Sequence, residues 1–469
     1  MTIHWHRRDL RGSDNRGLVR AADGPEPVVP LFVFDPTVLE HASPIRVACL
    51  LDALDGLREW YRARGSNLLI ECGEPSEVLP RVASARGADR VTWCADYSGL
   101  AAERDRAVTA ALEDGGVDCE PVHDAIHHAP GTITPNEGAH YSVFSYFWKK
   151  WRDRETRDPV ASPSADDLAS IADSSGRLPS ASELGFDEPA ATPRPVTQEA
   201  ARDRLDSFCS EPIYRYESTR EYPAAEGTSR LSVHLKWGTI GIRELHAATE
   251  AAAERAPDDD ARESVESFQR QLAWREFYTH VLAFNPETVS ENFTPFERDL
   301  EWRTDPDGFA TWKAGETGYP IVDAGMRQLR SEGWMHNRVR MIVASFLTKD
   351  LLIDWREGYD WFRRRLADHE TANDVGGWQW AASTGTDAQP YFRIFNPMKQ
   401  GRKYDPDAEY VRSYVSELEG VAAEDVHGWH DRTETERNRI APSYPAPIVD
   451  HAERRERALE AFERAKRKA

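Results

Sequence analysis

Glycine and hydroxyl residues cluster at positions 227–232, where the sequence reads Gly-Thr-Ser-Arg-Leu-Ser. Gly227, Thr228, Ser229 and Ser232 offer hydroxyls and backbone N–H groups in a turn that enters a predicted helix. Such a turn suits phosphate oxygens, because the first N–H groups of a helix have no partner within it. The same residues are also typical of an ordinary N-cap. Both interpretations stay open on these residues alone.

Five further segments combine charged, amide and aromatic side chains. The segments are Gln271–Tyr278, Gly318–Arg327, Gly333–Met341, Asp368–Ser383 and Phe392–Pro397.

Patterns of nucleophilic or metal catalysis are missing from the sequence. It contains no Ser-His-Asp order, zinc-ligand spacing or Walker loop. The five cysteines are scattered and include no Cys-x-x-Cys pair, which argues against a disulfide framework and a structural zinc site. We therefore expect no metal.

Short apolar strands alternate with helical periodicity over the first 125 residues, which predicts βαβ units and a parallel sheet. No Gly-x-Gly-x-x-Gly follows the first strand, so a dinucleotide in the usual Rossmann position is not indicated. The predicted strands are 2–6, 28–34, 67–71, 90–93 and 117–120, and the predicted helices are 46–64, 75–87 and 100–115.

Charged residues follow several of these strands. Ligands bind at the carboxyl ends of parallel strands, so we expect one crevice there, with a structural Arg7–Asp9 ion pair as the alternative use of those two residues. The residues expected at the crevice are Arg7, Arg8, Asp9, Asp35 and Asp96.

Composition changes after the predicted sheet. Residues 126–195 are rich in Pro, Ser, Ala and Asp, with an embedded aromatic patch at 141–151 that we expect to dock on a domain. Helical periodicity dominates from residue 198. We predict an α/β Rossmann-like N-terminal domain (1–125), an interdomain linker (126–197) and an all-α C-terminal domain (198–469).

The charge balance is acidic, with 80 Asp and Glu against 59 Lys and Arg and a net charge of −21. Only nine of the basic residues are lysines, which favours adaptation to high internal salt over an ordinary acidic enzyme. A DNA contact would require a local arginine cluster. No membrane-length apolar run or signal-like start is found, so we expect a cytoplasmic monomer.

The motifs, in this order and along essentially the whole chain, resemble class I photolyases of the photolyase/cryptochrome family, especially those of haloarchaea and cyanobacteria that repair cyclobutane dimers. The opening His-Arg-Arg-Asp-Leu-Arg with Asp14-Asn15 matches as well. The resemblance implies an antenna domain, a helical domain that binds U-shaped FAD, and light-driven lyase activity on UV-damaged DNA.

The resemblance also implies roles for individual residues. Arg340 would pair with Asp368, and a bidentate pair would hold that carboxylate in a fixed orientation. A buried structural salt bridge is the alternative, and one pair can serve both purposes. FAD contacts would come from Tyr216, Thr228, Ser229, Arg230, Leu231, Ser232, Phe268, Gln271, Arg275, Tyr278, Asn337, Arg340, Asp368, His369, Glu370 and Asp374. DNA and lesion contacts would come from Arg220, Gln271, Trp274, Asn337, Arg338, Met341, Trp380, Lys399 and Gln400.

Two further groups follow from the resemblance. Trp302, Trp355 and Trp378 match the electron-relay positions, although a tryptophan without this context is more often a core residue. Asp35, Arg46, Asp96 and Lys236 resemble the group that binds an 8-hydroxy-5-deazaflavin antenna rather than a folate, while Lys236 alone would suit a solvated helix face.

The sequence departs from the photolyase pattern at Gln271, where Glu is common, and at Asp374, where Asn is common. Glu370 and Phe268 replace an expected Asp and Trp. Asn337 and Met341 stand where the (6-4) branch carries histidines, which favours cyclobutane dimers. Asp374 supports the alternative of a cryptochrome-type photoreceptor without repair, and an electron-transfer flavoprotein unrelated to DNA is the third hypothesis.

Overall fold

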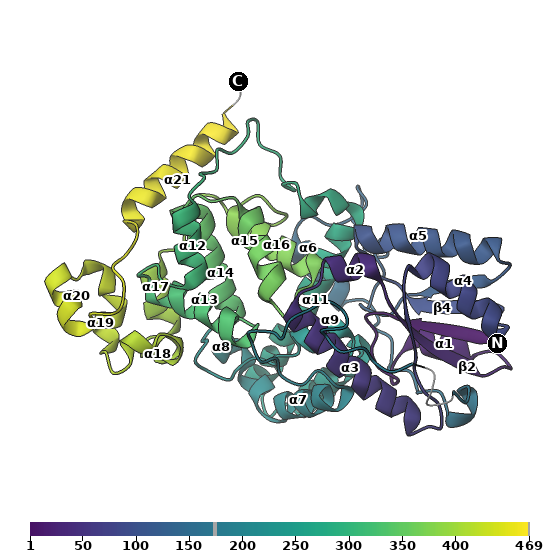
Figure 1. The fold of residues 1–469 in the computed structure, drawn as a ribbon. Coiled ribbons are helices and arrows are strands. Elements are labelled where there is room, and N and C mark those ends of the chain that lie inside the picture. Colours follow the sequence, from purple (N-terminus) through teal and green to yellow (C-terminus); the bar gives the residue numbers. More distant parts are fainter. Residues whose placement is uncertain (172–175, 468–469) are drawn as a thin grey trace. The chain divides into compact units, whose positions relative to one another are not determined.

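The computed structural model describes residues 1–171 and 176–467. Residues 172–175, within the predicted linker, and 468–469, at the end of a predicted basic helix, lie outside the described residues. The chain divides into two compact units (Figure 1). Unit 1 comprises Met1–Pro189, Pro193–Tyr216 and Ser229–Pro286, and unit 2 comprises Ala190–Thr192, Glu217–Thr228 and Glu287–Ala469.

Unit 1 contains a five-stranded sheet in the order β3-β2-β1-β4-β5. All four neighbouring pairs are parallel, as the alternating strand and helix pattern predicts. The strands are β1 (Thr2–His6), β2 (Val28–Phe34), β3 (Leu69–Cys72), β4 (Arg90–Cys94) and β5 (Asp118–Val122). The predicted strands are confirmed, with shifts of one or two residues at the ends of β3, β4 and β5.

The helices between these strands begin and end at recognisable signals. Asn15 and Ser98 cap α1 and α5 with their side chains, and Gly87 ends α4 in the left-handed conformation at φ 64°. Apolar side chains of α4 and α5, such as Val82 and Val108, pack in the core of the sheet. These helices are α1 (Arg16–Ala22), α2 (Pro36–Glu40), α3 (Pro44–Arg62), α4 (Pro75–Arg86) and α5 (Gly99–Asp114).

The rest of unit 1 is mainly helical. The predicted aromatic patch forms α6 (Phe144–Arg152), which packs on α11 (Asp259–Phe284) through Phe144 and Phe147 (Figure 1). The expected docking of this patch is therefore confirmed. The other elements of unit 1 are η1 (Ala165–Asp167), α7 (Gln198–Ser210), η2 (Pro212–Arg215), α9 (Ser232–Trp237) and α10 (Ile242–Glu254). The short helix α8 (Tyr216–Thr219) begins with the last residue of a unit 1 segment and continues in unit 2.

The regular secondary structure of unit 2 is all helical over its described residues, and the unit has its own apolar core. Its elements after η3 (Pro286–Val289) are α12 (Pro306–Ala314), α13 (Pro320–Glu332), α14 (Asn337–Ser345), the π-helix η4 (Phe346–Asp350), α15 (Trp355–Arg365), α16 (Thr371–Ala382), α17 (Pro397–Tyr404), α18 (Glu409–Tyr414), η5 (Ser416–Leu418), α19 (Ala423–His427), η6 (Trp429–Asp431), α20 (Glu434–Ile440) and α21 (His451–Lys466).

One helix predicted in unit 2 is divided. Helical periodicity over 336–355 predicts one continuous helix, but α14 gives way to the π-helix η4, and α15 begins at Trp355. The buried ammonium of Lys349 in η4 donates to the Ala382 carbonyl at 3.0 Å and lies 3.6 Å from the centre of the Phe462 ring of α21. Through Lys349, the π-helix η4 therefore contacts both the end of α16 and the C-terminal helix α21.

No described helix is long and apolar enough to cross a membrane. None of the five cysteines, all of which the structure describes, forms a disulfide.

Candidate functional site

The candidate cofactor residues of unit 1 lie along α11. Phe268, Gln271, Arg275 and Tyr278 follow one another at steps of three or four residues, which places them along one side of the helix. Phe268 packs against Phe208 and Tyr216, with ring centres 4.7 and 5.3 Å apart. The Phe that replaces the expected Trp therefore belongs to a buried aromatic cluster.

Two polar residues of α11 also have partners within unit 1. The Arg275 guanidinium donates to the Ala125 carbonyl at 2.9 Å, and the Gln271 amide donates to the Ser267 carbonyl at 3.0 Å. Arg275 is buried, whereas Gln271 is half-buried. A ligand can therefore engage the Gln271 side-chain carbonyl without breaking the hydrogen bond that the amide makes to Ser267.

The turn before α9 has an unusual backbone. Arg230 adopts φ 51°, in the left-handed region that non-glycine residues seldom visit. α9 begins at Ser232 with Leu231 as its N-cap, and no side chain caps it. The ordinary N-cap interpretation of Gly-Thr-Ser is therefore wrong for α9. Ser229 instead accepts from the Leu231 N–H at 3.4 Å, and its carbonyl is held by Arg204 at 2.7 Å.

Unit 2 contributes a connected group of charges from α14 and α16. Nη2 of Arg340 donates to both carboxylate oxygens of Asp368, at 3.0 and 2.8 Å, and Nη1 lies 3.8 Å from Asp374. Burial lowers the pKa of Arg340, but Asp368 and Asp374 outweigh it and leave the pKa raised. His369 hydrogen-bonds Asp374 at 2.5 Å, and Glu370 accepts from Asn373 at 2.8 Å.

This group presents fixed hydrogen-bond acceptors beside a cation. Asp368 is buried, and its orientation is fixed by Arg340, so it can accept from a ring N–H. The predicted Arg340–Asp368 pair is thus present with both oxygens engaged. Asn337, at the start of α14, is exposed and contacts Met341 of the same helix, 3.8 Å from its sulfur.

The three candidate relay tryptophans differ in burial. Trp378 and Trp355 are buried, and Trp355 donates its indole N–H to Asn292 at 2.9 Å. Trp302 is half-buried and meets Phe462 of α21 edge-on, with ring centres 6.3 Å apart. Of the three tryptophans, Trp302 is therefore the one most exposed to solvent.

The candidate DNA residues have partners that the sequence did not indicate. Phe144 stacks on Trp274 with ring centres 3.6 Å apart, so one face of that indole is covered. Trp380 lies beside Phe395, with ring centres 6.3 Å apart. Lys399 is exposed and Gln400 half-buried, both on α17.

Two arginines of unit 2 form ion pairs that sequence reasoning missed. Arg338 pairs with Glu221, and Arg220 lies 3.7 Å from Glu217 and 3.6 Å from Glu221. Arg338 and Glu221 are 117 positions apart, so residue spacing gave no signal for that pair. Glu217 and Arg220 stand at the i,i+3 spacing of an ion pair, a signal that the sequence reasoning did not use.

The crevice residues beyond the sheet edge form a charged group. Arg8 lies 3.3 Å from Asp96 and also donates to the Lys236 carbonyl at 3.3 Å. Burial raises the pKa of Asp96, but the nearby cations Arg8, Arg7, Arg104 and Lys236 lower it by more than burial raises it. The pKa of Asp96 is therefore below its ordinary value. Arg104, missed by the sequence analysis, lies 3.8 Å from Asp35, which caps α2.

The contacts of Arg46 and Arg7 bear on two of the predictions for this group. Arg46 donates to the His41 carbonyl at 2.6 Å, so its guanidinium lies beside the C-terminal end of α2. The Arg7–Asp9 ion pair is wrong: the Arg7 guanidinium contacts Asp105 and the Cys94 carbonyl, while only its backbone N–H reaches Asp9, at 2.8 Å.

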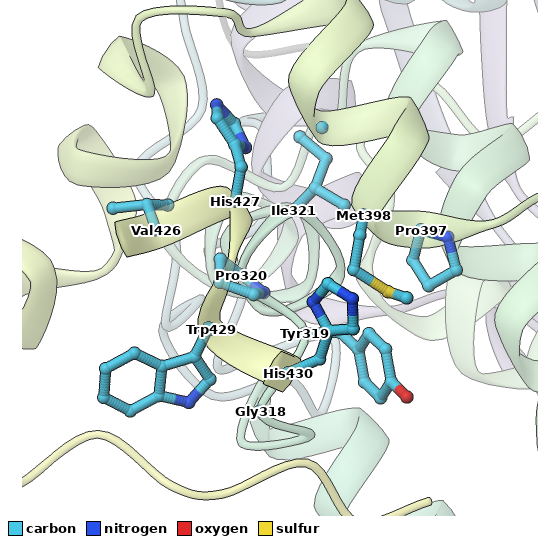
Figure 2. Close-up of a pocket in the computed structure, with 11 residues that line it drawn as sticks. Gly318, Tyr319, Pro320, Ile321, Pro397, Met398, Val426, His427, Trp429 and His430 are labelled. Carbon is cyan, nitrogen blue, oxygen red and sulfur yellow. The ribbon is translucent and has the colours of Figure 1, made fainter. Parts of the chain in front are cut away.

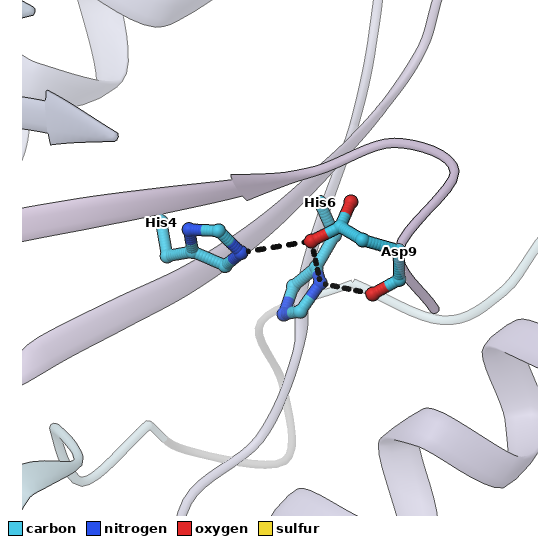
Figure 3. Close-up of side chains that lie close together, drawn as sticks. All are labelled: His4, His6 and Asp9. Atoms are coloured by element: carbon cyan, nitrogen blue, oxygen red, sulfur yellow. Dashed lines mark hydrogen bonds and ion pairs between the residues drawn. The ribbon is translucent and has the colours of Figure 1, made fainter. Parts of the chain in front are cut away.

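Asp9 is instead the centre of a buried histidine pair (Figure 3). His4 Nε2 lies 3.0 Å and His6 Nδ1 3.3 Å from the same Asp9 oxygen. The other ring nitrogens contact Thr92 at 3.0 Å and Tyr61 at 2.7 Å. The three groups are close enough to ligate a metal ion, but every ring nitrogen already has a protein partner, so hydrogen bonding accounts for the arrangement.

Unit 2 also contains a hollow of about 280 Å³ between the start of α13, α17 and α19, part of it open to solvent (Figure 2). Its walls are mainly apolar, with Met398 and Trp429 among them, and none of the predicted site residues lines it. It is therefore separate from the candidate site.

Known photolyases match this chain over nearly its whole length. Residues 2–164 match the family model described as DNA photolyase, and residues 268–464 match the FAD binding domain of DNA photolyase. A Halobacterium salinarum protein named deoxyribodipyrimidine photo-lyase is 58% identical over 99% of both chains.

Solved structures agree in fold. A class III photolyase from Agrobacterium tumefaciens superposes with a TM-score of 0.89 at 34% identity, covering 99% of this chain and 97% of its own. A Synechocystis cryptochrome also gives 0.89, at 25% identity, covering 98% and 99%. Because relatives well above 30% identity extend over nearly the whole chain, this chain belongs to the DNA photolyase family.

Proposed function

We propose that this protein is a deoxyribodipyrimidine photo-lyase, which uses light and bound FAD to split cyclobutane pyrimidine dimers in DNA. The observation that carries the proposal is 58% identity, over 99% of both chains, to a relative of that name. The Arg340–Asp368 pair and the three tryptophans support it independently, because each has the geometry or burial that its expected role needs.

FAD is proposed to be held by two sets of side chains. One set is Asp368, oriented by Arg340, together with Asn337, His369, Glu370 and Asp374, and the other is the α11 face with the turn before α9. When bound, FAD supplies the light-excited electron donor, so the chain needs no nucleophile or metal of its own. Asp368 accepts a hydrogen bond, and Arg340 holds it in place.

Aromatic residues are proposed to receive the lesion. A dimer stacks poorly within the duplex and costs little to flip out. A flipped base could stack on the rigid rings of Trp274 and Trp380. Phe144 covers one face of the Trp274 ring, so the base would stack on the opposite face. Arg220, Arg338, Lys399 and Gln400 would contact the backbone, and Gln271, Asn337 and Met341 the dimer.

Two finer assignments belong to the same proposal. The cations Arg8, Arg7, Arg104 and Lys236 around Asp96 favour an acidic antenna chromophore of the deazaflavin type, with Asp35 and Arg46 beside it. Trp302, Trp355 and Trp378 are proposed to conduct electrons from solvent toward the cofactor. The enzyme is proposed to act as a monomer on UV-damaged DNA.

The test uses the purified, photoreduced protein and an oligonucleotide that contains one thymine cyclobutane dimer, in high salt. We expect intact thymines to appear under blue light and not in a dark control. A parallel oligonucleotide with a (6-4) photoproduct should stay unrepaired. Repair that continues in darkness contradicts the proposal. Absence of repair of both lesions, with FAD absorbance present, favours the cryptochrome-type photoreceptor.

A further inference from the structure

Arg338, at the start of α14, is held by a carboxylate from a distant segment of unit 2. Its Nε and Nη2 both pair with the same oxygen of Glu221. The guanidinium also lies over the Tyr404 ring, 4.4 Å from its centre. The side chains of Arg338 and Glu221 are 14% and 30% exposed, so the pair lies at the surface and is open to solvent.

The surroundings of the pair are rich in cations although the chain is strongly acidic. Lys403 lies 4.8 Å from the centre of the Tyr404 ring, and Arg220 lies 3.6 Å from the second Glu221 oxygen. Lys399 and Arg402 are exposed on the same helix, α17, as Lys403. Glu221 is therefore a carboxylate placed inside a local basic surface.

Carboxylate and phosphate bind the guanidinium fork in the same way. We propose that Glu221 is a built-in competitor for the DNA backbone: it occupies Arg338 in the free protein and must be displaced by a phosphate when DNA binds. This inference rests on the proposed function, because it takes DNA as the partner of Arg338. It adds a residue whose charge opposes binding.

The competitor has a consequence for salt dependence. Salt weakens phosphate contacts, and it also weakens, to a smaller extent, a partly exposed ion pair such as Arg338–Glu221. As salt rises, Arg338 is released more easily while the attraction of DNA falls. The two effects partly offset each other, so Glu221 makes DNA affinity less steeply dependent on salt.

The test is a dark binding titration of FAD-loaded wild type and variants with a fluorescent oligonucleotide that contains one cyclobutane dimer, from low to high KCl. Glu221→Gln should tighten binding about two- to fivefold at low salt, from the usual strength of exposed pairs. The gain should shrink as KCl rises. Glu217→Gln is the matched control for a general change in charge, because Glu217 lies in the same segment and approaches Arg220 at 3.7 Å, as Glu221 does at 3.6 Å.

A double-mutant cycle separates competition from a structural effect. In an Arg338→Gln background, the effect of Glu221→Gln should fall to that of Glu217→Gln. If Glu221→Gln weakens binding, Glu221 orients Arg338 for the phosphate and the inference is overturned. An effect equal to that of Glu217→Gln in the wild-type background also overturns it. If FAD-loaded wild type does not prefer dimer-containing DNA, the proposed function itself fails, and the inference fails with it.

Discussion

At the scale of single residues, the orientation of Asp368 depends on one arginine. Both of its oxygens accept from Nη2 of Arg340, and its side chain is only 2% exposed. A buried carboxylate that loses its cation is costly to the folded state. Because Arg340 also approaches Asp374, a single substitution disturbs two carboxylates that are proposed to face the flavin.

We therefore expect Arg340→Met to lower the free energy of unfolding by about 2–4 kcal/mol, since it leaves Asp368 without its partner. FAD should dissociate more readily from the variant as well. Arg262→Met is the control, because Arg262 pairs with Asp259 on the exposed face of α11, and it should cost less than about 1 kcal/mol. Urea unfolding and flavin release by gel filtration measure the two effects. Equal losses for both variants would contradict the role given to Arg340.

At the scale of elements, α15 and α16 approach each other closely at Gly358. A Cβ at this position would overlap the Trp378 ring, and it would also come 2.6 Å from a Leu347 methyl group. Trp378 is further packed by Phe362, whose ring centre lies 4.9 Å away. The glycine therefore sets where a proposed relay tryptophan lies.

Gly358→Ala should cost about 1–3 kcal/mol through overpacking and should displace the Trp378 ring. Gly377→Ala on α16 is the matched control: a Cβ there meets nothing within 4 Å, so it should stabilise the helix by about 0.5–1 kcal/mol. Thermal unfolding measures the stabilities, and tryptophan fluorescence reports the ring. If Gly358→Ala is as stable as wild type with unchanged fluorescence, the close approach of the two helices is wrong.

At the scale of the whole molecule, stability should depend on pH through buried histidines. Burial lowers the pKa of His4, His128, His234 and His280 to about 4 and that of His127 to about 2. The unfolded chain binds protons on these rings below about pH 6.5, and the folded chain does not. The stability they contribute is therefore complete above that pH and is lost as pH falls toward 4.

Glu276 acts in the opposite direction. Burial raises its pKa to about 8, although it accepts from the His127 and His128 backbone N–H groups. Its contribution is present below about pH 4.5 and is lost as pH rises through 8. Calorimetry from pH 4.5 to 9 at constant salt should show stability that falls steeply toward acid pH and gently toward alkaline pH. Glu276→Gln should reduce the loss of stability at alkaline pH, and an unchanged loss would contradict this assignment.

The net charge of −21 predicts a second property of the whole molecule. Self-repulsion among surplus carboxylates destabilises the folded state, and salt screens it. We expect the melting temperature to rise markedly between 0.1 and 2 M KCl. Sucrose, which carries no charge, serves as a control for general exclusion from the surface. A melting temperature insensitive to KCl would contradict the interpretation of the acidic composition.

The sequence alone determined the βαβ sheet, the helical character of the second half and the family, because strand alternation, helical periodicity and ordered motifs are local patterns. It also predicted the Arg340–Asp368 pair, through the resemblance. The functional domain boundaries stay predictions, since the compact units divide the helical region differently.

Tertiary structure decided what residue spacing does not encode. The Arg7 guanidinium contacts Asp105 rather than Asp9, Phe144 covers one face of Trp274, and Glu221 occupies Arg338. Each partner lies more than ninety positions away, so only packing brings it within reach. The break after α14 is likewise tertiary, because Lys349 there engages α16 and α21. Local sequence selects elements, whereas the partners of a side chain depend on which elements pack together.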